Sequence, residues 1–245
     1  MNDSIDFQVV TESVTSVLEP RLREVEYISP SWNFIVVLLA ILFMVLNKHL
    51  FTSRFRMMLS VLVQSSDSDK MTREWNPIVS VNGFTVFVSY VAMLALIVQK
   101  IVLVFSKNTI LYSSFSFYID VCVYITALCV VQYLVITLYG WLFNISAATT
   151  HEEVTHLSSM AVLNIVMIVL GLIIIFYPIK IVLIITISII LIIMAIRIIK
   201  TFFEFQILSK MNLLNNFLYF CTLEIVPLLV AITMMCRLIV TDCVL

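Results

Sequence analysis

Six long apolar stretches constrain this chain more than any other feature of its sequence. They run at about 32–46, 81–105, 117–143, 160–176, 179–199 and 216–240. A helix that crosses the hydrocarbon core of a bilayer needs roughly 20 apolar residues in a row. The strands of a membrane barrel would instead alternate apolar and polar residues over ~10 positions, and these stretches show no such alternation. The sequence therefore predicts an all-α fold, a polytopic transmembrane bundle of about six helices.

The overall composition excludes several classes of protein. Hydrophobic residues make up 62% of the chain and charged residues 12%, against about 25% charged residues in an ordinary soluble domain. A water-soluble fold of 245 residues could not bury so much apolar surface. The net charge of −1 provides no basic field for nucleic acid. We therefore expect membrane lipids as partners and no nucleic acid.

Cysteine and histidine spacing gives no sign of a metal or redox centre. The five cysteines form no C-x-x-C pair, and a free thiol in an apolar stretch behaves as a small hydrophobe. His151 and His156 flank two glutamates, but a zinc-binding H-E-x-x-H motif needs its histidines four apart. We interpret residues 151–156 as a solvated cap before the fourth helix. Neither a P-loop nor a G-x-S-x-G motif is present, and we expect no metal, no other cofactor and no catalytic residue.

Two segments outside the apolar stretches have soluble character. Residues 1–30 form an amphipathic tail with apolar residues at helical spacing, which lies on the membrane or the bundle or docks a partner. We take residues 31–245 as the transmembrane domain. Within that domain, residues 47–80 combine an amphipathic helix with a polar surface loop.

The amphipathic helix within 47–80 has the pattern of a helix that lies in the membrane interface. Its apolar face would comprise Phe51, Phe55, Met58, Leu59 and Leu62. Lys48, Arg54 and Arg56 flank that face, where they would bind anionic headgroups. Trp32, at the start of the first apolar stretch, is a further candidate anchor in the interface.

The distribution of Lys and Arg among the loops predicts the orientation. With six helices, the loop 47–80 shares a side with two other loops, and this side carries eight basic residues against five on the other. Short loops that are rich in Lys and Arg stay in the cytosol. We therefore expect a multi-pass protein of the cell inner membrane with both termini on the non-cytosolic side.

Charged residues within or near the apolar stretches are few, and each is costly in lipid. Lys100 lies near the end of the second stretch and Asp120 near the start of the third. Because consecutive helices are antiparallel, these two residues would have similar depth, which predicts a structural ion pair. One alternative is that Lys100 extends to the interface and Asp120 is hydrated. Another is that the two residues belong to a proton or ion pathway. Lys200 and Glu204, four residues apart, are expected to pair on a helix surface.

Glu224 is the strongest single candidate for a functional residue. It lies about eight residues into the sixth stretch, so ~12 Å deep. Pro227 has no N–H and deprives a carbonyl one turn earlier of its helix partner. With Thr222 beside it and Gln132 of the third stretch at similar depth, this region could bind a substrate or a proton. The alternatives are a structural hydrogen-bonded cluster and a contact with another protein.

The sixth stretch also carries a resemblance. Residues 217–229 read FLYFCTLEIVPLL, and the chain has a tryptophan before the first helix followed by an R-F-R segment at 54–56. These features resemble an uncharacterised family of Bacteroidota inner-membrane proteins, a domain of unknown function with a C-terminal Cys-Thr-Leu-Glu-Ile-x-Pro signature. The resemblance implies an inner-membrane location and a polytopic helical fold. It implies no activity.

Two classes of function fit these observations. Small loops and the lack of a chemical motif favour a non-enzymatic subunit or assembly factor of an envelope complex, such as one for secretion or lipoprotein handling. Other envelope membrane proteins would then be its partners. The alternative is a stand-alone carrier of a small molecule or lipid, or a lipid-modifying protein, with its site around Glu224 and Pro227.

Overall fold

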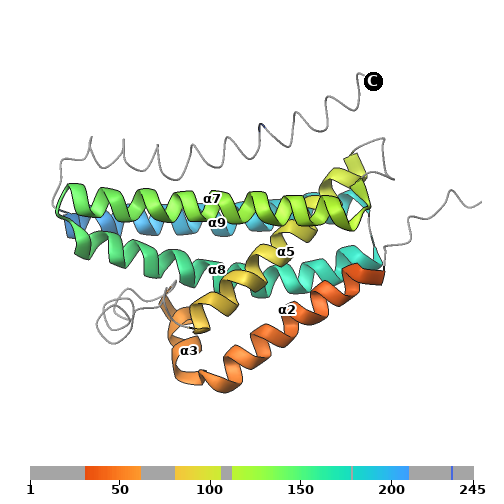
Figure 1. Cartoon of the computed structure of the whole chain (residues 1–245), viewed down its shortest axis with the longest axis horizontal. Coiled ribbons are helices and arrows are strands. Elements are labelled where there is room, and N and C mark those ends of the chain that lie inside the picture. The colour runs from red at the N-terminus through yellow and green to blue at the C-terminus, as the bar shows by residue number, and fades with distance from the viewer. Residues whose placement is uncertain (1–30, 62–80, 106–111, 178, 210–232, 234–245) are drawn as a thin grey trace, which may run out of the picture.

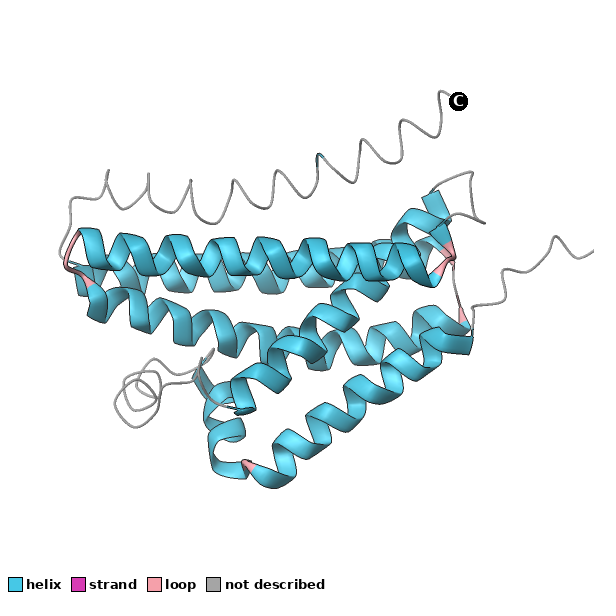
Figure 2. Cartoon of the chain, in the orientation of Figure 1, coloured by secondary structure: helices cyan, strands magenta, loops and turns pink. Residues whose placement is uncertain are grey.

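The described part of the structure, a computed structural model, covers residues 31–61, 81–105, 112–177, 179–209 and 233, and its regular elements are all helices (Figure 2). In chain order they are α2 (Ser31–Leu50), α3 (Thr52–Val61), α5 (Val81–Phe105), α7 (Phe115–Leu142), α8 (Ser146–Phe176) and α9 (Lys180–Ser209). All except α3 are long and apolar enough to cross a membrane. The predicted all-α polytopic fold is confirmed. The predicted sixth helix at 216–240 and the tail at 1–30 lie outside the described residues.

Helices α5 and α8 form the centre of the bundle. Helix α5 packs against α2, α7 and α8, and α8 also contacts α3 and α9. Figure 1 shows that α5 crosses the bundle diagonally and that its C-terminal part approaches α7. The ends of α2, α7 and α9 and the starts of α5 and α8 gather on the side of the bundle where α3 lies. We call this side the α3 end.

Polar side chains connect the interior helices to one another. Asn164 Nδ2 on α8 donates to Ser89 Oγ on α5 at 2.7 Å, and Ser89 Oγ donates to the Ala40 carbonyl of α2 at 3.4 Å. Nearer the α3 end, Thr85 Oγ1 donates to Asn47 Oδ1 at 2.8 Å. Polar groups between transmembrane helices need such partners because the lipid offers none. These contacts therefore specify which faces of α2, α5 and α8 turn inward.

Helices α5 and α7 are fastened together at the end opposite α3. Gln99 Nε2 donates to the carbonyl of Tyr112 at 2.8 Å, and the Tyr118 hydroxyl donates to the Ala92 carbonyl at 3.3 Å. The Ser114 hydroxyl caps α7 by accepting a backbone N–H three residues on, at 3.2 Å. Polar contacts thus hold the two helices close at this end, and nearer the α3 end a cavity separates them, as described below.

The turn between α7 and α8 is tight. Asn144 adopts a φ of 55°, a left-handed conformation that asparagine tolerates better than most residues. Just before the turn, Gly140 is pressed against Thr149, because a Cβ built on this glycine would lie 2.3 Å from Thr149 Oγ1. The lack of a side chain at position 140 therefore allows α8 to fold back closely on α7.

Some predicted helix bounds are wrong. The fourth helix was expected at 160–176 but begins at Ser146, and the fifth was expected to end at 199 but reaches Ser209. Residues 151–156 are consequently not a solvated cap: they lie within α8, and His151 and Glu152 are buried. A polar segment resembles a loop in sequence, but here its polar side chains face neighbouring helices.

Candidate functional site

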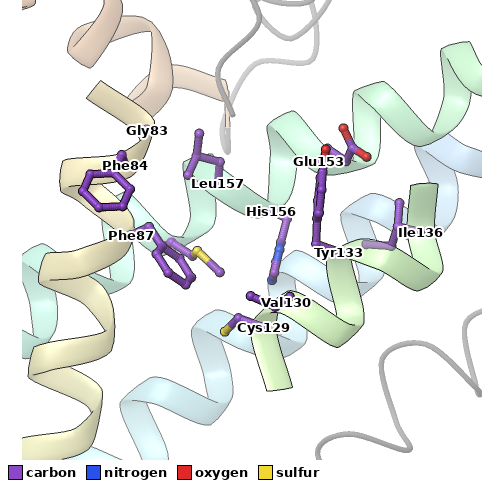
Figure 3. A pocket seen from close by; sticks show the side chains of 11 residues that line it. Gly83, Phe84, Phe87, Cys129, Val130, Tyr133, Ile136, Glu153, His156 and Leu157 are labelled. Carbon is purple, nitrogen blue, oxygen red and sulfur yellow. The ribbon is translucent and has the colours of Figure 1, made fainter. Parts of the chain in front are cut away.

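A cavity of about 200 Å³ lies between α5, α7 and α8, towards the α3 end. Figure 3 shows the rings of Phe84 and Phe87 on the α5 side, Val130 and Tyr133 on the α7 side, and His156 of α8 between them. The lining is mainly apolar and aromatic, as expected for a pocket that binds an organic molecule. Its remaining members are Gly83, Cys129, Ile136, Glu153, Leu157 and Met160.

The pocket opens sideways. Phe84 and Val130, which lie on its two rims, are both exposed, at 63% and 48% of their surface. Exposed apolar residues within spanning helices face lipid, because the hydrocarbon core contains no water. A molecule could therefore enter the pocket from the membrane, between α5 and α7.

Polar groups are concentrated at one part of the wall. The Thr137 hydroxyl on α7 donates to Glu153 Oε1 at 3.0 Å and also lies 3.0 Å from the carbonyl of Tyr133. This contact holds the Glu153 side chain against α7 at the edge of the pocket. His156 lies one turn further along α8 and is only partly exposed. The site thus offers a carboxylate, an imidazole and a phenol among aromatic and aliphatic side chains.

Arg197 of α9 contributes positive charge behind this wall. It is buried, and it lies near enough to interact electrostatically with His156 and with the thiol of Cys129. A buried guanidinium within a membrane span marks either a structural ion pair or a functional site. Its place next to two pocket residues extends the electrostatic influence of α9 into the cavity.

A further charged cluster ties α9 to α8 and α3. Glu204 Oε2 lies 3.6 Å from His151 Nδ1, and Glu204 Oε1 lies 3.5 Å from Lys200 Nζ. Lys200 also donates to the carbonyl of Val61, at the end of α3. The predicted pairing of Lys200 with Glu204 is confirmed, but the pair is mostly buried and not on an open surface.

The depth of the pocket can be read from α8. Its membrane-spanning part begins at Ala148, so Glu153 lies about 8 Å and Met160 about 18 Å along the helix, at ~1.5 Å per residue. The hydrocarbon core is about 30 Å thick. The pocket therefore occupies the half of the membrane at the α3 end, with Glu153 towards the surface and Met160 towards the middle.

The site predicted from sequence around Glu224, with Thr222 and Pro227, lies outside the described residues. Gln132, its proposed neighbour on α7, is partly buried and does not line the pocket. Lys100 is 1% exposed, whereas Asp120 is exposed. These unequal surroundings are not those of a buried ion pair, and the pairing of Lys100 with Asp120 stays a prediction.

The predicted interface anchors have mixed surroundings. Lys48, Arg54 and Arg56 are exposed at the α3 end, where headgroups would meet them. The apolar face of α3 is turned to protein, since its residues Phe55, Met58 and Val61 are buried. Trp32 is at the other end of the bundle and packs on Phe115 and Tyr118, with ring centroids 5.4 and 5.1 Å apart.

Sequence reasoning missed the pocket because it assigned residues 151–156 to a loop. The signal was present, since Val154 and Leu157 continue the apolar spacing of the fourth stretch back through this segment. Extending the helix by that spacing would have placed Glu153 and His156 within the membrane. Their proximity to α7 could not have been predicted, because it depends on how α5 and α7 separate.

Comparisons with known proteins assign the chain to a family. A domain of unknown function (DUF4271) matches residues 33–235, which is most of the chain and all five described spanning helices except the first two residues of α2. No curated protein and no solved structure shows significant similarity to the chain. The chain is a polytopic helical membrane protein that belongs to the DUF4271 family.

Proposed function

We propose that this protein binds the headgroup end of a membrane lipid in the pocket between α5, α7 and α8. The observation that carries the proposal is the lateral opening of an apolar pocket with polar groups at its surface side. Phe84 and Val130 form the exposed rims, and Glu153 and His156 supply the polar groups. A membrane lipid arranges its own groups in the same order along the membrane normal, with its polar headgroup at the surface and its apolar chains towards the middle.

The size of the pocket supports partial entry of the lipid. About 200 Å³ exceeds the roughly 30 Å³ that one water molecule occupies in the liquid, but a whole phospholipid would not fit. The headgroup and the first carbons of the chains would be enclosed, while the remaining chains stay among the surrounding lipids. This assigns to Glu153 and His156 the small-molecule or lipid site that sequence reasoning expected around Glu224.

Two variants of neighbouring residues on α7 test the proposal. Val130→Trp places a large ring at the rim of the pocket, whereas Val131→Trp changes a residue that is exposed to a similar degree but does not line it. Native mass spectrometry in mild detergent should detect co-purified lipid on the wild type and on Val131→Trp, and much less on Val130→Trp. Equal lipid occupancy of the three proteins would contradict the proposal.

A subunit of an envelope complex is the second candidate. The observation that favours it is the shortness of the connections between α7, α8 and α9, at 143–145 and 177–179, which leave no room there for a catalytic domain outside the membrane. The resemblance noted above supports an inner-membrane location in Bacteroidota, and secretion or lipoprotein handling is the setting that we propose for such a subunit. Purification of the tagged protein from its native host in mild detergent would recover a stoichiometric partner. Recovery alone or as a homo-oligomer would favour an independent lipid-binding protein.

For the orientation, we propose that the α3 end faces the cytosol and that both termini are non-cytosolic. Lys48, Arg54 and Arg56 are exposed there, in agreement with the positive-inside rule. The pocket would then open into the cytosolic leaflet. A cysteine at Ser53, which is exposed between Lys48 and Arg56, should react with an impermeant maleimide only after the cells are opened, and reaction in intact cells would reverse the orientation.

A further inference from the structure

We infer that the pocket selects phospholipids whose headgroup carries a primary amine, an inference that rests on the lipid binding proposed above. Polar and apolar groups follow one another in a fixed order along α8. Glu153 is nearest the surface, His156 is one turn deeper, and Leu157 and Met160 continue the wall inward. An aminophospholipid presents its ammonium group outermost, then its phosphate, then its ester groups and chains.

Glu153 provides the acceptor for the ammonium group. An ionised carboxylate accepts hydrogen bonds at both oxygens and donates none, and a primary ammonium has three N–H donors. Thr137 occupies part of the acceptor capacity of Oε1 and thereby fixes the side chain on α7. Glu153 lines the cavity at its edge, where a charge-assisted hydrogen bond from an ammonium group would be stronger than one from a neutral donor.

His156, with Arg197 buried behind it, provides the hydrogen-bond donor of the pocket. The imidazole of His156 lines the cavity, and the buried guanidinium of Arg197 acts on it electrostatically. A phosphate one turn deeper than the ammonium group would accept a hydrogen bond from the one N–H of a neutral imidazole and would lie on the side of the pocket where Arg197 is buried. The protein thus presents a carboxylate and then a hydrogen-bond donor in the order in which an aminophospholipid presents its ammonium group and its phosphate.

Other common headgroups match this order less well. A glycerol headgroup has no cation for Glu153, so its phosphate would bring net negative charge next to a carboxylate. A choline headgroup is cationic but has no N–H to donate. It could be attracted to Glu153 by charge without a hydrogen bond, or lie against the aromatic faces of Phe84, Phe87 and Tyr133. The carboxylate therefore distinguishes the primary amine from both alternatives.

The experiment compares three lipids that share dioleoyl chains and differ in their ethanolamine, choline or glycerol headgroup. Each is titrated onto delipidated wild-type protein in detergent and followed by native mass spectrometry. We expect the ethanolamine lipid to bind about tenfold more tightly than the other two, the size expected of one charge-assisted hydrogen bond. Similar affinities for the three lipids, or a preference for choline or glycerol, would overturn the inference even if no variant folds.

Two carboxylate variants localise the effect. Glu153→Gln keeps an oxygen that can accept from Thr137 but removes the charge, and it should reduce ethanolamine binding to the level of the other lipids. Asp120→Asn removes an exposed carboxylate from α7 at the other end of the bundle and should retain the full preference. A Glu153→Gln protein that elutes normally and still prefers ethanolamine would contradict the role of Glu153.

The two proposals fail in different ways. If Val130→Trp abolishes binding of all three lipids while the wild type shows no preference, lipid binding stands and headgroup selection is wrong. If Val130→Trp binds every lipid as the wild type does, lipid binding in this pocket is wrong, and the headgroup inference falls with it.

Discussion

Helices α5 and α9 are both strongly apolar, yet they occupy opposite environments. Helix α9 contains the most apolar stretch of the five spanning helices, but only a small part of that stretch is buried, whereas most of the corresponding stretch of α5 is buried. The buried residues of α5 include Asn82, Ser89, Gln99 and Lys100. In a membrane, lipid solvates an apolar helix as well as protein does. Polar side chains, and not apolarity, therefore determine which helix lies at the centre.

The largest expected effect comes from shortening apolar side chains on these two helices. Leu96 on α5 is 0% exposed and Ile192 on α9 is 59% exposed. Leu96→Ala leaves a cavity in packed protein and should cost about 2–5 kcal/mol. Ile192→Ala should cost less than about 0.5 kcal/mol, because lipid or detergent can fill the space. Thermal unfolding in detergent measures both.

A large loss of stability for Ile192→Ala would break this comparison. It would mean that something other than lipid or detergent covers this part of α9 in the purified protein. If Ile192→Ala lowers the stability only of protein purified from the native host, the molecule that covers this part of α9 is a partner protein. That result would favour the envelope-subunit proposal.

A second test asks how tightly the interior is packed. A Cβ at Gly140 would meet Thr149 Oγ1 at 2.3 Å and Thr149 Cγ2 at 2.9 Å, whereas a Cβ at Gly171 would meet the tip of Met93 on α5 at 2.7 Å. Thr149 is β-branched and stiff, but Met93 has three rotatable bonds. Gly140→Ala should destabilise by about 1–3 kcal/mol and Gly171→Ala by clearly less. Equal losses would show that Met93 cannot move, and that α5 is packed as rigidly as the α7–α8 turn.

A third test compares one serine on each helix. Ser89 on α5 accepts from Asn164 at 2.7 Å, whereas Ser188 on α9 is exposed and bonds the carbonyl of Ile184 in its own helix at 2.9 Å. Ser89→Ala should cost about 0.6 kcal/mol and at most about 1.7 kcal/mol, the average and the maximum for interhelical hydrogen bonds in a membrane protein. Ser188→Ala should leave the unfolding midpoint unchanged. If both substitutions were neutral, the hydrogen bond to Asn164 would not be what holds α8 against α5.

The sequence predicted the spanning helices well because the cost of exposing backbone groups to lipid leaves few alternatives. The stretch at 81–105 matches α5 residue for residue, Val81–Phe105. It predicted the start of α8 badly, because polar residues such as Glu153 and Thr155 resemble a loop when their inward direction is unknown. Hydropathy also could not rank α5 as interior and α9 as peripheral, since it records composition and not which face carries the polar groups.

The site was less predictable than the fold. Its carboxylate and imidazole come from residues 151–156, for which the sequence predicts a loop. The α7 side of the pocket faces them from a different part of the chain. Only the separation of α5 and α7 towards the α3 end, after their close contact at Gln99 and Tyr112, creates the space between them. Such a crossing angle depends on packing between helices far apart in sequence, and no local pattern encodes it.

The smallest expected effect concerns Lys100 on α5 and Asp120 on α7, of which the first is buried and the second exposed. Lys100 is buried, so Lys100→Asp should reduce expression, whereas Asp120 is exposed and Asp120→Lys should be tolerated. If the two side chains pair, the double exchange should express better than Lys100→Asp and Asp120→Lys alone. The gain should stay below about 1 kcal/mol, because a partner in contact with solvent contributes little. A double exchange that expresses no better than Lys100→Asp would count against the pair and leave burial alone to explain why position 100 is sensitive.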